Sequence, residues 1–226
     1  ILKLYLTQHF IPPPFGLLNN TYSVQPGEII TFDLNGNKKC MPYWTFPEYN
    51  HHQNENIEIL NQVETELDSA VKAELLSDVP LGALLSGGVD SPLICYFAKN
   101  NIGKNFNTFS MGSDSPVHDE TAQALKYANY LETSHYSTNM NAENSLEALD
   151  RAVVSAGEPF GDFSIIPTWQ VSKLAKEKVT VALSGDGGDE LFFGYERFRS
   201  IGKNHRYWNY PFWLRHYLRG LDKLIY

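Results

Sequence analysis

The sequence predicts an α/β fold: a parallel sheet with helices on both faces, preceded by a short β-hairpin segment. Short apolar runs alternate with helical patterns over residues 57–190, and this alternation is typical of βαβ units. Two of the runs end in glycine-rich turns. The 226 residues are enough for one large α/β domain or a domain with a small appendage.

The N-terminal part of the chain predicts a small hairpin. Two β-like runs, Thr21–Val24 and Ile29–Asp33, flank the turn Gln25-Pro26-Gly27. A second turn follows at Asn35-Gly36-Asn37.

From residue 57 the periodicity predicts regular elements in alternation. Apolar residues such as Leu60, Val63 and Leu67 recur three and four positions apart, which indicates an amphipathic helix. The expected helices are 57–76, 92–98, 119–131, 145–156 and 167–177; the expected strands are 81–85, 105–111, 135–138 and 179–183, the last of them buried. The helix over 145–156 is expected to turn its larger apolar residues inward: Leu146, Leu149, Ala152 and Val153.

Composition excludes several classes of protein. Eighteen Lys and Arg against twenty-six Asp and Glu give a net charge of −8, and no basic run offers a surface for nucleic acid. Only Cys40 and Cys95 are present, which indicates neither a disulfide framework nor a cysteine zinc site and favours a reducing cytoplasm. No segment has the length and hydrophobicity of a membrane span.

The first glycine-rich turn, Ser86-Gly87-Gly88-Val89-Asp90-Ser91, predicts an anion-binding loop. Glycines let a phosphate approach the backbone, and the hydroxyls of Ser86 and Ser91 can donate to phosphate oxygens. The turn lacks the lysine of a Walker A loop and the spacing of a dinucleotide fingerprint. Because Asp90 would repel a phosphate unless a cation lies between them, the turn predicts Mg²⁺ bound jointly with phosphate.

The second glycine-rich turn, residues 184–190, supplies the expected partner for Asp90. One carboxylate is a poor magnesium site, and Asp189 is the natural second ligand if the two preceding strands are neighbours. The alternative interpretation is that each turn only caps a helix, with glycine for positive φ and aspartate for the helix dipole.

These motifs resemble a known family. The first turn looks like the pyrophosphatase loop (PP-loop) of ATP-pyrophosphatase enzymes, and the segment 183–195, LSGDGGDELFFGY, closely resembles the signature of the glutamine-hydrolysing asparagine synthetases. Further matches are Glu158-Pro159-Phe160-Gly161-Asp162, Ile166-Pro167-Thr168, Pro26-Gly27-Glu28 and Tyr43-Trp44.

The resemblance implies a fold of the adenine nucleotide alpha hydrolase-like kind and a C–N bond-forming ligase. In such enzymes a glutaminase domain releases ammonia from glutamine, and a synthetase domain uses ATP and Mg²⁺ to adenylate aspartate, giving asparagine, AMP and pyrophosphate. Residues 1–50 then look like the end of the glutaminase domain, and residues 52–226 like a synthetase domain that is incomplete at its C-terminus. The resemblance also implies a glutaminase nucleophile and a catalytic lysine that have no counterpart here, so the piece alone is expected to synthesise weakly or not at all.

The resemblance also implies roles for particular residues. Asp90 and Asp189 would hold the metal, and Asp186 would act as the base for attacking ammonia, one methylene shorter than the glutamate of some members. Pro92 departs from the family pattern at a helix start, where proline is tolerated. The remaining implied nucleotide contacts are Ser86, Gly87, Gly88 and Ser91 at the pyrophosphate, Ser184 and Gly185 at the nucleotide, and Leu84 and Met111 at the adenosine.

Other polar residues have competing interpretations. Glu158 and Asp162 could face the substrate's ammonium group or cap neighbouring helices. Capping is favoured over metal binding for His118, Asp119 and Glu120, because consecutive residues do not share a helix face. The pair His51-His52 is expected in a solvated loop, and Cys95 as a small buried apolar group.

Three alternative functions remain open at this point. A relative could adenylate another carboxylate, as β-lactam-forming members do; a tRNA-modifying enzyme would need a basic surface that is lacking; and a nucleotide-binding piece could lack turnover. The aromatic tail 197–226 is expected to pack on the sheet domain or to form an interface to a segment that is missing here. If the tail is left partly exposed, self-association is expected, with a homodimer as one assembly.

Overall fold

The computed structural model describes residues 1–48, 56–103, 105–115, 119–203, 209–211 and 214. The chain forms two units, residues 1–183 and 184–226. The boundary expected near residue 52, the pair His51-His52, and His118 lie outside the described residues, as does most of the aromatic tail.

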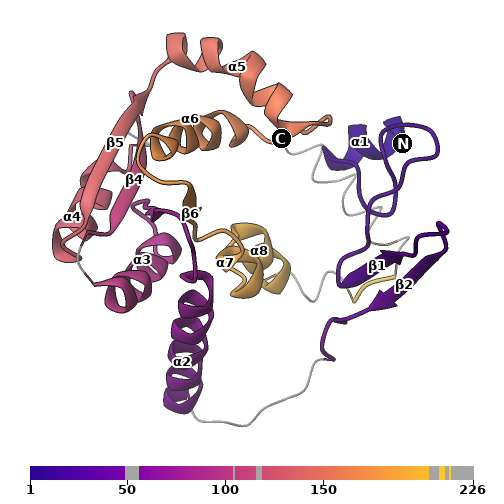
Figure 1. Ribbon diagram of the computed structural model, residues 1–226, viewed down its shortest axis with the longest axis horizontal. Coiled ribbons are helices and arrows are strands. Elements are labelled where there is room, and N and C mark those ends of the chain that lie inside the picture. The colour runs from indigo at the N-terminus through magenta and orange to yellow at the C-terminus, as the bar shows by residue number, and fades with distance from the viewer. Residues whose placement is uncertain (49–55, 104, 116–118, 204–208, 212–213, 215–226) are drawn as a thin grey trace. The chain divides into compact units, whose positions relative to one another are not determined.

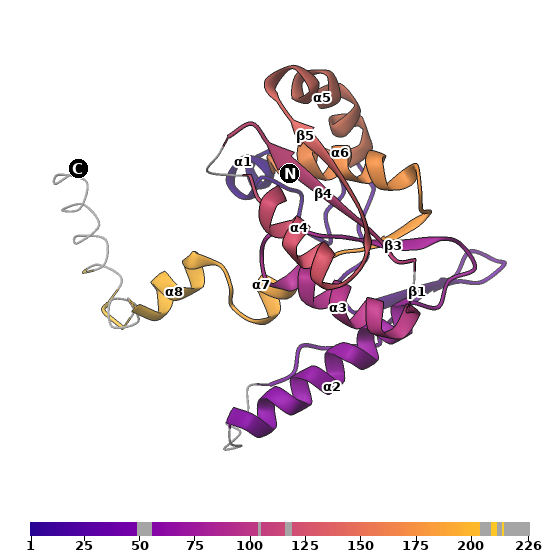
Figure 2. The same cartoon turned by 90° about the vertical axis from the view of Figure 1, so that its left-hand side faces the viewer.

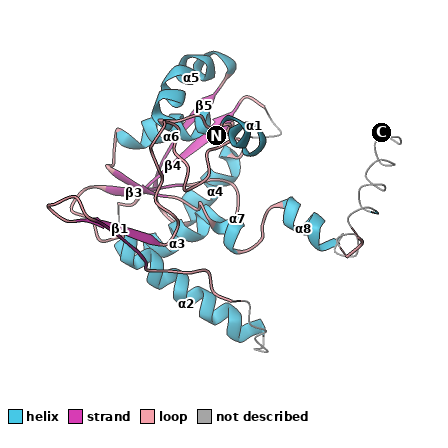
Figure 3. Cartoon of the chain, turned by 90° about the vertical axis from the view of Figure 1, so that its right-hand side faces the viewer, coloured by secondary structure: helices cyan, strands magenta, loops and turns pink. Residues whose placement is uncertain are grey.

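The first unit contains the parallel sheet that the sequence predicts. Its strands lie in the order β5-β4-β3-β6, and every neighbouring pair is parallel. The strands are β3 (Leu81–Leu84), β4 (Asn107–Ser113), β5 (Ser134–Met140) and β6 (Val181–Leu183). The first three are labelled and drawn in magenta in Figure 3, and β6 is labelled in Figure 1. β3 and β6, which precede the two glycine-rich turns, are therefore neighbours.

Helices cover both faces of this sheet, as expected (Figures 1 and 2). They are α2 (Asn56–Glu74), α3 (Asp90–Ile102), α4 (Thr121–Tyr130), α5 (Ala142–Ala156) and α6 (Ile165–Lys176). α3 and α4 pack on one face with α2 against α3, whereas α6 packs on the other face and α5 packs against α6.

Two apolar clusters follow from the alternation of side chains along the strands. Ala83 and Leu85 join residues of α3 and α4, including Cys95. Leu84 and Phe109, which point to the opposite face, pack with residues of α6. The sheet is thus buried on both sides at its centre, which is the usual state of a parallel sheet.

The N-terminal hairpin forms, but not between the runs predicted from the sequence. β1 (Glu28–Phe32) pairs antiparallel with β2 (Lys38–Pro42), whereas Tyr22 makes only an isolated bridge to Phe15. The turn at Asn35-Gly36-Asn37 decides the pairing, because the Asp33 carboxylate accepts hydrogen bonds from the backbone N–H groups of residues 35 and 37. The short helix α1 (Leu2–Gln8) was not expected.

The inner face of α5 also differs from the expectation. Ala148 and Ala152 are its buried residues, whereas Leu146 is 72% exposed and Leu149 and Val153 are exposed as well. The helix instead meets α6 through small residues, and the Gln170 amide of α6 donates to the backbone oxygen of Asn144 at 3.0 Å. The small side chains of α5 let it approach α6 closely, whereas the larger apolar side chains of α5 face outward.

The strand expected to be buried, 179–183, is only partly so. Val179 is buried, but it lies before β6, and Val181 within the strand is 39% exposed. The reason is that β6 is at the end of the sheet order and pairs only with β3.

A half-buried histidine lies in a polar network between β4 and β5. His135 Nδ1 is 3.0 Å from Thr108 Oγ1, and its Nε2 is 3.1 Å from Ser110 Oγ. Thr108 Oγ1 is in turn 2.8 Å from Thr133 Oγ1. Burial lowers the pKa of His135 from its ordinary value of 6.5, so the fold favours the neutral imidazole.

This network predicts a pH-dependent stability. Below pH 6.5 the unfolded chain binds a proton that folded His135 resists, so the free energy of unfolding is expected to fall as the pH drops from about 6.5 towards the lower folded pKa. Urea unfolding at pH 7.5 and pH 5.5 measures the effect. His135→Gln should unfold with a smaller pH dependence, and an unchanged dependence in that variant would contradict the assignment.

Candidate active site

The first glycine-rich turn lies between the carboxyl end of β3 and the start of α3. Ser91 Oγ accepts a hydrogen bond from the Ser86 backbone N–H at 2.7 Å and lies 2.8 Å from Ser86 Oγ. The Gly88 N–H donates to Ser86 Oγ at 3.2 Å. The turn is thus curled around two hydroxyls, of which that of Ser91 belongs to a buried residue. This is the strand-loop-helix setting in which parallel-sheet proteins bind phosphate groups.

Gly87 has little space for a side chain. A Cβ at this position would lie 2.9 Å from the Glu120 Cβ and 3.2 Å from the Gln123 Cβ. Its backbone N–H donates to the Glu120 carboxylate at 2.9 Å. Glycine is therefore required here by the close approach of the start of α4 to the loop.

The contact between Glu120 and the loop was not predicted. Sequence reasoning favoured capping for this residue, but Glu120 makes no side-chain capping bond to α4. Asp119 does bind the helix start: it accepts from the Thr121 hydroxyl at 2.6 Å and from the Thr121 N–H at 3.1 Å. These bonds hold the pKa of Asp119 below its ordinary value. Of the two described acids, Asp119 therefore stabilises the start of α4 as expected, whereas Glu120 does not.

Asp90 begins α3 directly after the loop and is half-buried. Among the described residues its carboxylate has no hydrogen-bond or ion-pair partner, and carboxylate oxygens are ligands that Mg²⁺ prefers. These two features fit a metal ligand. No group of three or more His, Cys, Asp or Glu able to hold a metal occurs within the described ranges. The pairing of Asp90 with Asp189 stays a prediction.

Two residues of α3 that follow the loop, Pro92 and Cys95, have the positions that the sequence predicts. Pro92 lies in the first turn of α3, which continues unbroken to Ile102. Cys95 is fully buried, its thiol lies 3.7 Å from the Leu84 backbone oxygen, and burial raises its pKa to about 12. A thiol with this pKa is not a nucleophile at neutral pH, so Cys95 is a small core residue as expected.

Leu84 and Met111, the expected adenosine contacts, lie on one face of the sheet. Both pack against the apolar cluster that contains Phe109 and α6. The structure therefore brings these two side chains to one cluster, and their contact with a nucleotide stays a prediction.

The segment before α6 contains two acidic residues, Glu158 and Asp162, and one of them has a local structural role. Asp162 Oδ1 accepts a hydrogen bond from the Ser164 N–H at 2.8 Å, two residues on, just before the helix begins. Glu158 is exposed. Asp162 thus stabilises a turn just before α6, whose N-cap residue is Ser164. Substrate binding by Glu158 and Asp162 stays a prediction.

The second unit starts with the second glycine-rich turn, which leads into α7 (Gly188–Leu191). Gly187 has a φ of +94°, which disfavours any residue with a side chain. Asp186 is exposed, whereas Asp189 is half-buried. The Gly194 N–H donates to the Asp189 backbone oxygen at 3.0 Å, and a Cβ at Gly194 would collide with the Asp189 carboxylate. The glycine before Tyr195 thus leaves space for this carboxylate.

A second carboxylate of this unit is held by a hydrogen bond that sequence reasoning missed. The Tyr195 hydroxyl donates to Glu190 Oε1 at 2.7 Å, which lowers the pKa of Glu190 and raises that of Tyr195. The Arg197 guanidinium lies 4.3 Å from the centre of the Tyr195 ring. These contacts orient the chain after α7. In the sequence, the short separation of five residues between Glu190 and Tyr195 was the feature that could have indicated this hydrogen bond.

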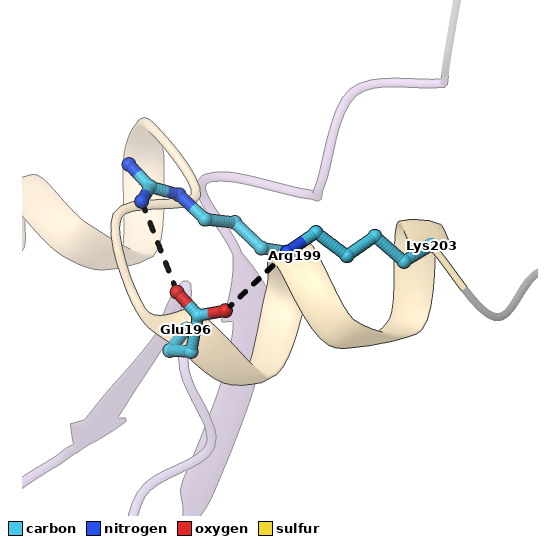
Figure 4. Close-up of polar contacts among 3 residues, drawn as sticks. All are labelled: Glu196, Arg199 and Lys203. Atoms are coloured by element: carbon cyan, nitrogen blue, oxygen red, sulfur yellow. Dashed lines mark ion pairs between the residues drawn. The ribbon is translucent and has the colours of Figure 1, made fainter.

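The helix that follows, α8 (Glu196–Lys203), carries exposed ion pairs (Figure 4). Glu196 is 3.8 Å from Arg199 and 4.0 Å from Lys203. Because all three side chains are largely exposed, the pairs contribute little to stability.

Comparison with known proteins decides the family. The model of the asparagine synthase family matches residues 62–224. This chain belongs to the asparagine synthase family. It is 35% identical over 197 residues to a putative glutamine-hydrolysing asparagine synthetase 2 of Methanocaldococcus jannaschii, a match that covers 86% of the chain and 38% of the relative. It is 33% identical over 198 residues to asparagine synthetase 1 of Bacillus subtilis, covering 88% and 31%.

The asparagine synthase relatives are thus much longer than the matched region, which spans about a third of their length. Among solved structures, an NH3-dependent NAD synthetase from Campylobacter jejuni is similar with a TM-score of 0.42 and 16% identity, over 60% of each chain. Membership of the asparagine synthase family supports a ligase at family level. Within the described residues, no helix has the length and hydrophobicity to cross a membrane.

Proposed function

We propose that this chain forms the nucleotide-binding part of an ATP- and magnesium-dependent ligase that adenylates aspartate and amidates it with ammonia from glutamine. The observation that carries the proposal is the curled loop after β3, with its two linked hydroxyls and a free carboxylate at Asp90 within the described residues. Family membership supplies the reaction class.

The proposal assigns roles to residues of both glycine-rich turns. Each turn follows one of two neighbouring parallel strands, β3 and β6, and ligands of parallel sheets bind beyond the carboxyl ends of the strands. In the proposal Ser86, Gly87, Gly88 and Ser91 hold the pyrophosphate group, and Ser184 and Gly185 contact the nucleotide. Leu84 and Met111 line the adenosine pocket.

Asp90 and Asp189 are the residues that would hold Mg²⁺ in this site. The ion, when bound, neutralises charge on the pyrophosphate leaving group. The aspartate β-carboxylate attacks the α-phosphorus of ATP, the bond to pyrophosphate breaks, and ammonia then displaces AMP. Asp186 removes a proton from the attacking ammonia.

The domain organisation belongs to the same proposal. Residues 1–50 correspond to the end of a glutaminase domain, and residues 52–226 to part of the synthetase domain. The substrates of the parent enzyme would be aspartate, ATP and glutamine, in the cytoplasm, with a homodimer as the expected assembly.

Exchange of labelled pyrophosphate into ATP tests the adenylation half-reaction. With the parent enzyme, exchange is expected to depend on magnesium and on aspartate. Exchange that requires a different carboxylate, tested in parallel with glutamate and with a carboxyalkylated amino acid, would favour the related adenylating enzymes. Nucleotide binding without exchange for any carboxylate would favour a module without turnover.

Asp186 is expected to act after adenylation. In the parent enzyme, Asp186→Asn should lower ammonium-dependent asparagine formation by about a hundredfold, which is typical for loss of a general base, and should lower pyrophosphate exchange much less. Parallel assays of the two half-reactions measure this. Equal losses in both would show that Asp186 has a different role, and Asp186→Glu, which restores the longer carboxylate, should retain amidation.

A further inference from the structure

The three successive N–H groups of the first loop are all engaged without a ligand. The N–H of Ser86 donates to Ser91 Oγ, and the N–H of Gly88 donates to Ser86 Oγ, so both bonds stay within the loop. The N–H of Gly87 differs, because it donates to the Glu120 carboxylate at 2.9 Å, from a residue 33 positions away. Gly87 is thus held by an anion that belongs to the protein.

A carboxylate resembles a phosphate group in the features that this N–H recognises. Both present negatively charged oxygens, and both form strong charge-assisted hydrogen bonds with backbone N–H groups. One N–H pointing at Glu120 cannot at the same time donate fully to a phosphate oxygen. The negative charge of Glu120 would also repel a polyphosphate placed beside it.

The position of Glu120 allows it to leave the loop. The residue is exposed and precedes the first turn of α4, and its side chain makes no capping bond to that helix. Asp119 supplies the bonds to Thr121 at the helix start. Rotation of the Glu120 side chain therefore breaks the contact with Gly87 and leaves α4 intact.

We propose that Glu120 is an internal competitor of the pyrophosphate group at the first loop. It occupies the Gly87 N–H in the ligand-free protein, gives it up when a polyphosphate binds, and takes it back when pyrophosphate leaves. Its effect is to weaken the hold of the loop on pyrophosphate and so to favour product release. This inference rests on the proposed function, because it requires the loop to be the pyrophosphate site.

Binding of inorganic pyrophosphate in the presence of magnesium, measured by calorimetry on the full chain, tests the proposal. Glu120→Ala is expected to bind pyrophosphate about tenfold more tightly than the unsubstituted protein, since one charge-assisted hydrogen bond no longer has to be broken. Glu120→Gln, which keeps a neutral acceptor, should gain less. Asp119→Asn removes a charge from the adjacent residue, which does not touch the loop, and should change the affinity less than twofold.

The outcomes separate this proposal from the proposed function. Unchanged or weaker binding by Glu120→Ala, with binding intact in the unsubstituted protein, would overturn the competitor role alone. Absence of pyrophosphate and ATP binding in all proteins would overturn the proposed function and this inference together. The Gly87 amide resonance gives an independent readout: without ligand it should differ between the unsubstituted protein and Glu120→Ala, and saturation with pyrophosphate should remove most of that difference. A difference that persists at saturation would contradict the exchange of partners.

Discussion

Replacement of Asp90 by alanine is expected to weaken magnesium-dependent binding of ATP more than a hundredfold. Changes to groups that only orient a metal ligand already cost 10- to 100-fold in affinity, and loss of a ligand should cost more. Asp90 directly follows the loop and its carboxylate has no partner among the described residues, so a metal would not compete with an existing ion pair. Calorimetric titration with ATP, with and without magnesium, measures the effect.

Two further variants, Asp189→Ala and the double variant, test whether Asp90 and Asp189 bind the same ion. Asp189→Ala should cause a similar loss, and the double variant should lose little more than either single one, because two ligands of one ion are not independent. Asp150→Asn on the exposed side of α5 is a control of equal charge change and should bind normally. Binding that is independent of magnesium, or additive losses in the double variant, would contradict a shared ion.

Replacement of Phe109 by alanine is expected to lower the free energy of unfolding by about 3–5 kcal/mol. Phe109 is 0% exposed and lies in β4, near the middle of the sheet. Its ring stacks on that of Tyr136 in β5 at a centroid distance of 5.7 Å, and it packs against Val171 and Ala175 of α6. Truncation leaves a cavity that the sheet backbone cannot close. Urea unfolding followed by circular dichroism measures the loss.

Phe163 is the matched control for this substitution. It is 92% exposed, in the loop before α6, so Phe163→Ala removes the same atoms at no cost in packing. Its free energy of unfolding should change by less than about 0.5 kcal/mol. Similar losses in the two variants would contradict the position of Phe109 in the core.

The elements around the sheet could be predicted because their periodicity is strong. The run at Leu81–Leu84 and the helix at Asn56–Glu74 follow the expected patterns closely. The hairpin could not be placed, because its register depends on hydrogen bonds from the Asp33 side chain rather than on β propensity. For α5, apolar periodicity predicted an inner face of Leu146, Leu149, Ala152 and Val153. Of these only Ala152 is buried, together with Ala148, because the contact with α6 accommodates small side chains.

The candidate site could be predicted where its residues are consecutive. Ser86 and Ser91 lie in one motif, and the structure joins their hydroxyls. Glu120 could not be found in this way, because its contact with Gly87 depends on how closely the start of α4 approaches the loop. Long-range contacts of this kind leave no periodic pattern in the sequence.

In the proposed function the two glycine-rich turns hold one metal-bound nucleotide. Paramagnetic Mn²⁺, which prefers the same oxygen ligands as Mg²⁺, tests it when added with ATP to isotope-labelled protein. The amide resonances of Gly87 and Gly88 and those of Gly185 and Gly187 are expected to broaden together, while those of α5 stay sharp. Broadening of the first turn alone, with the second unaffected, would contradict a shared site.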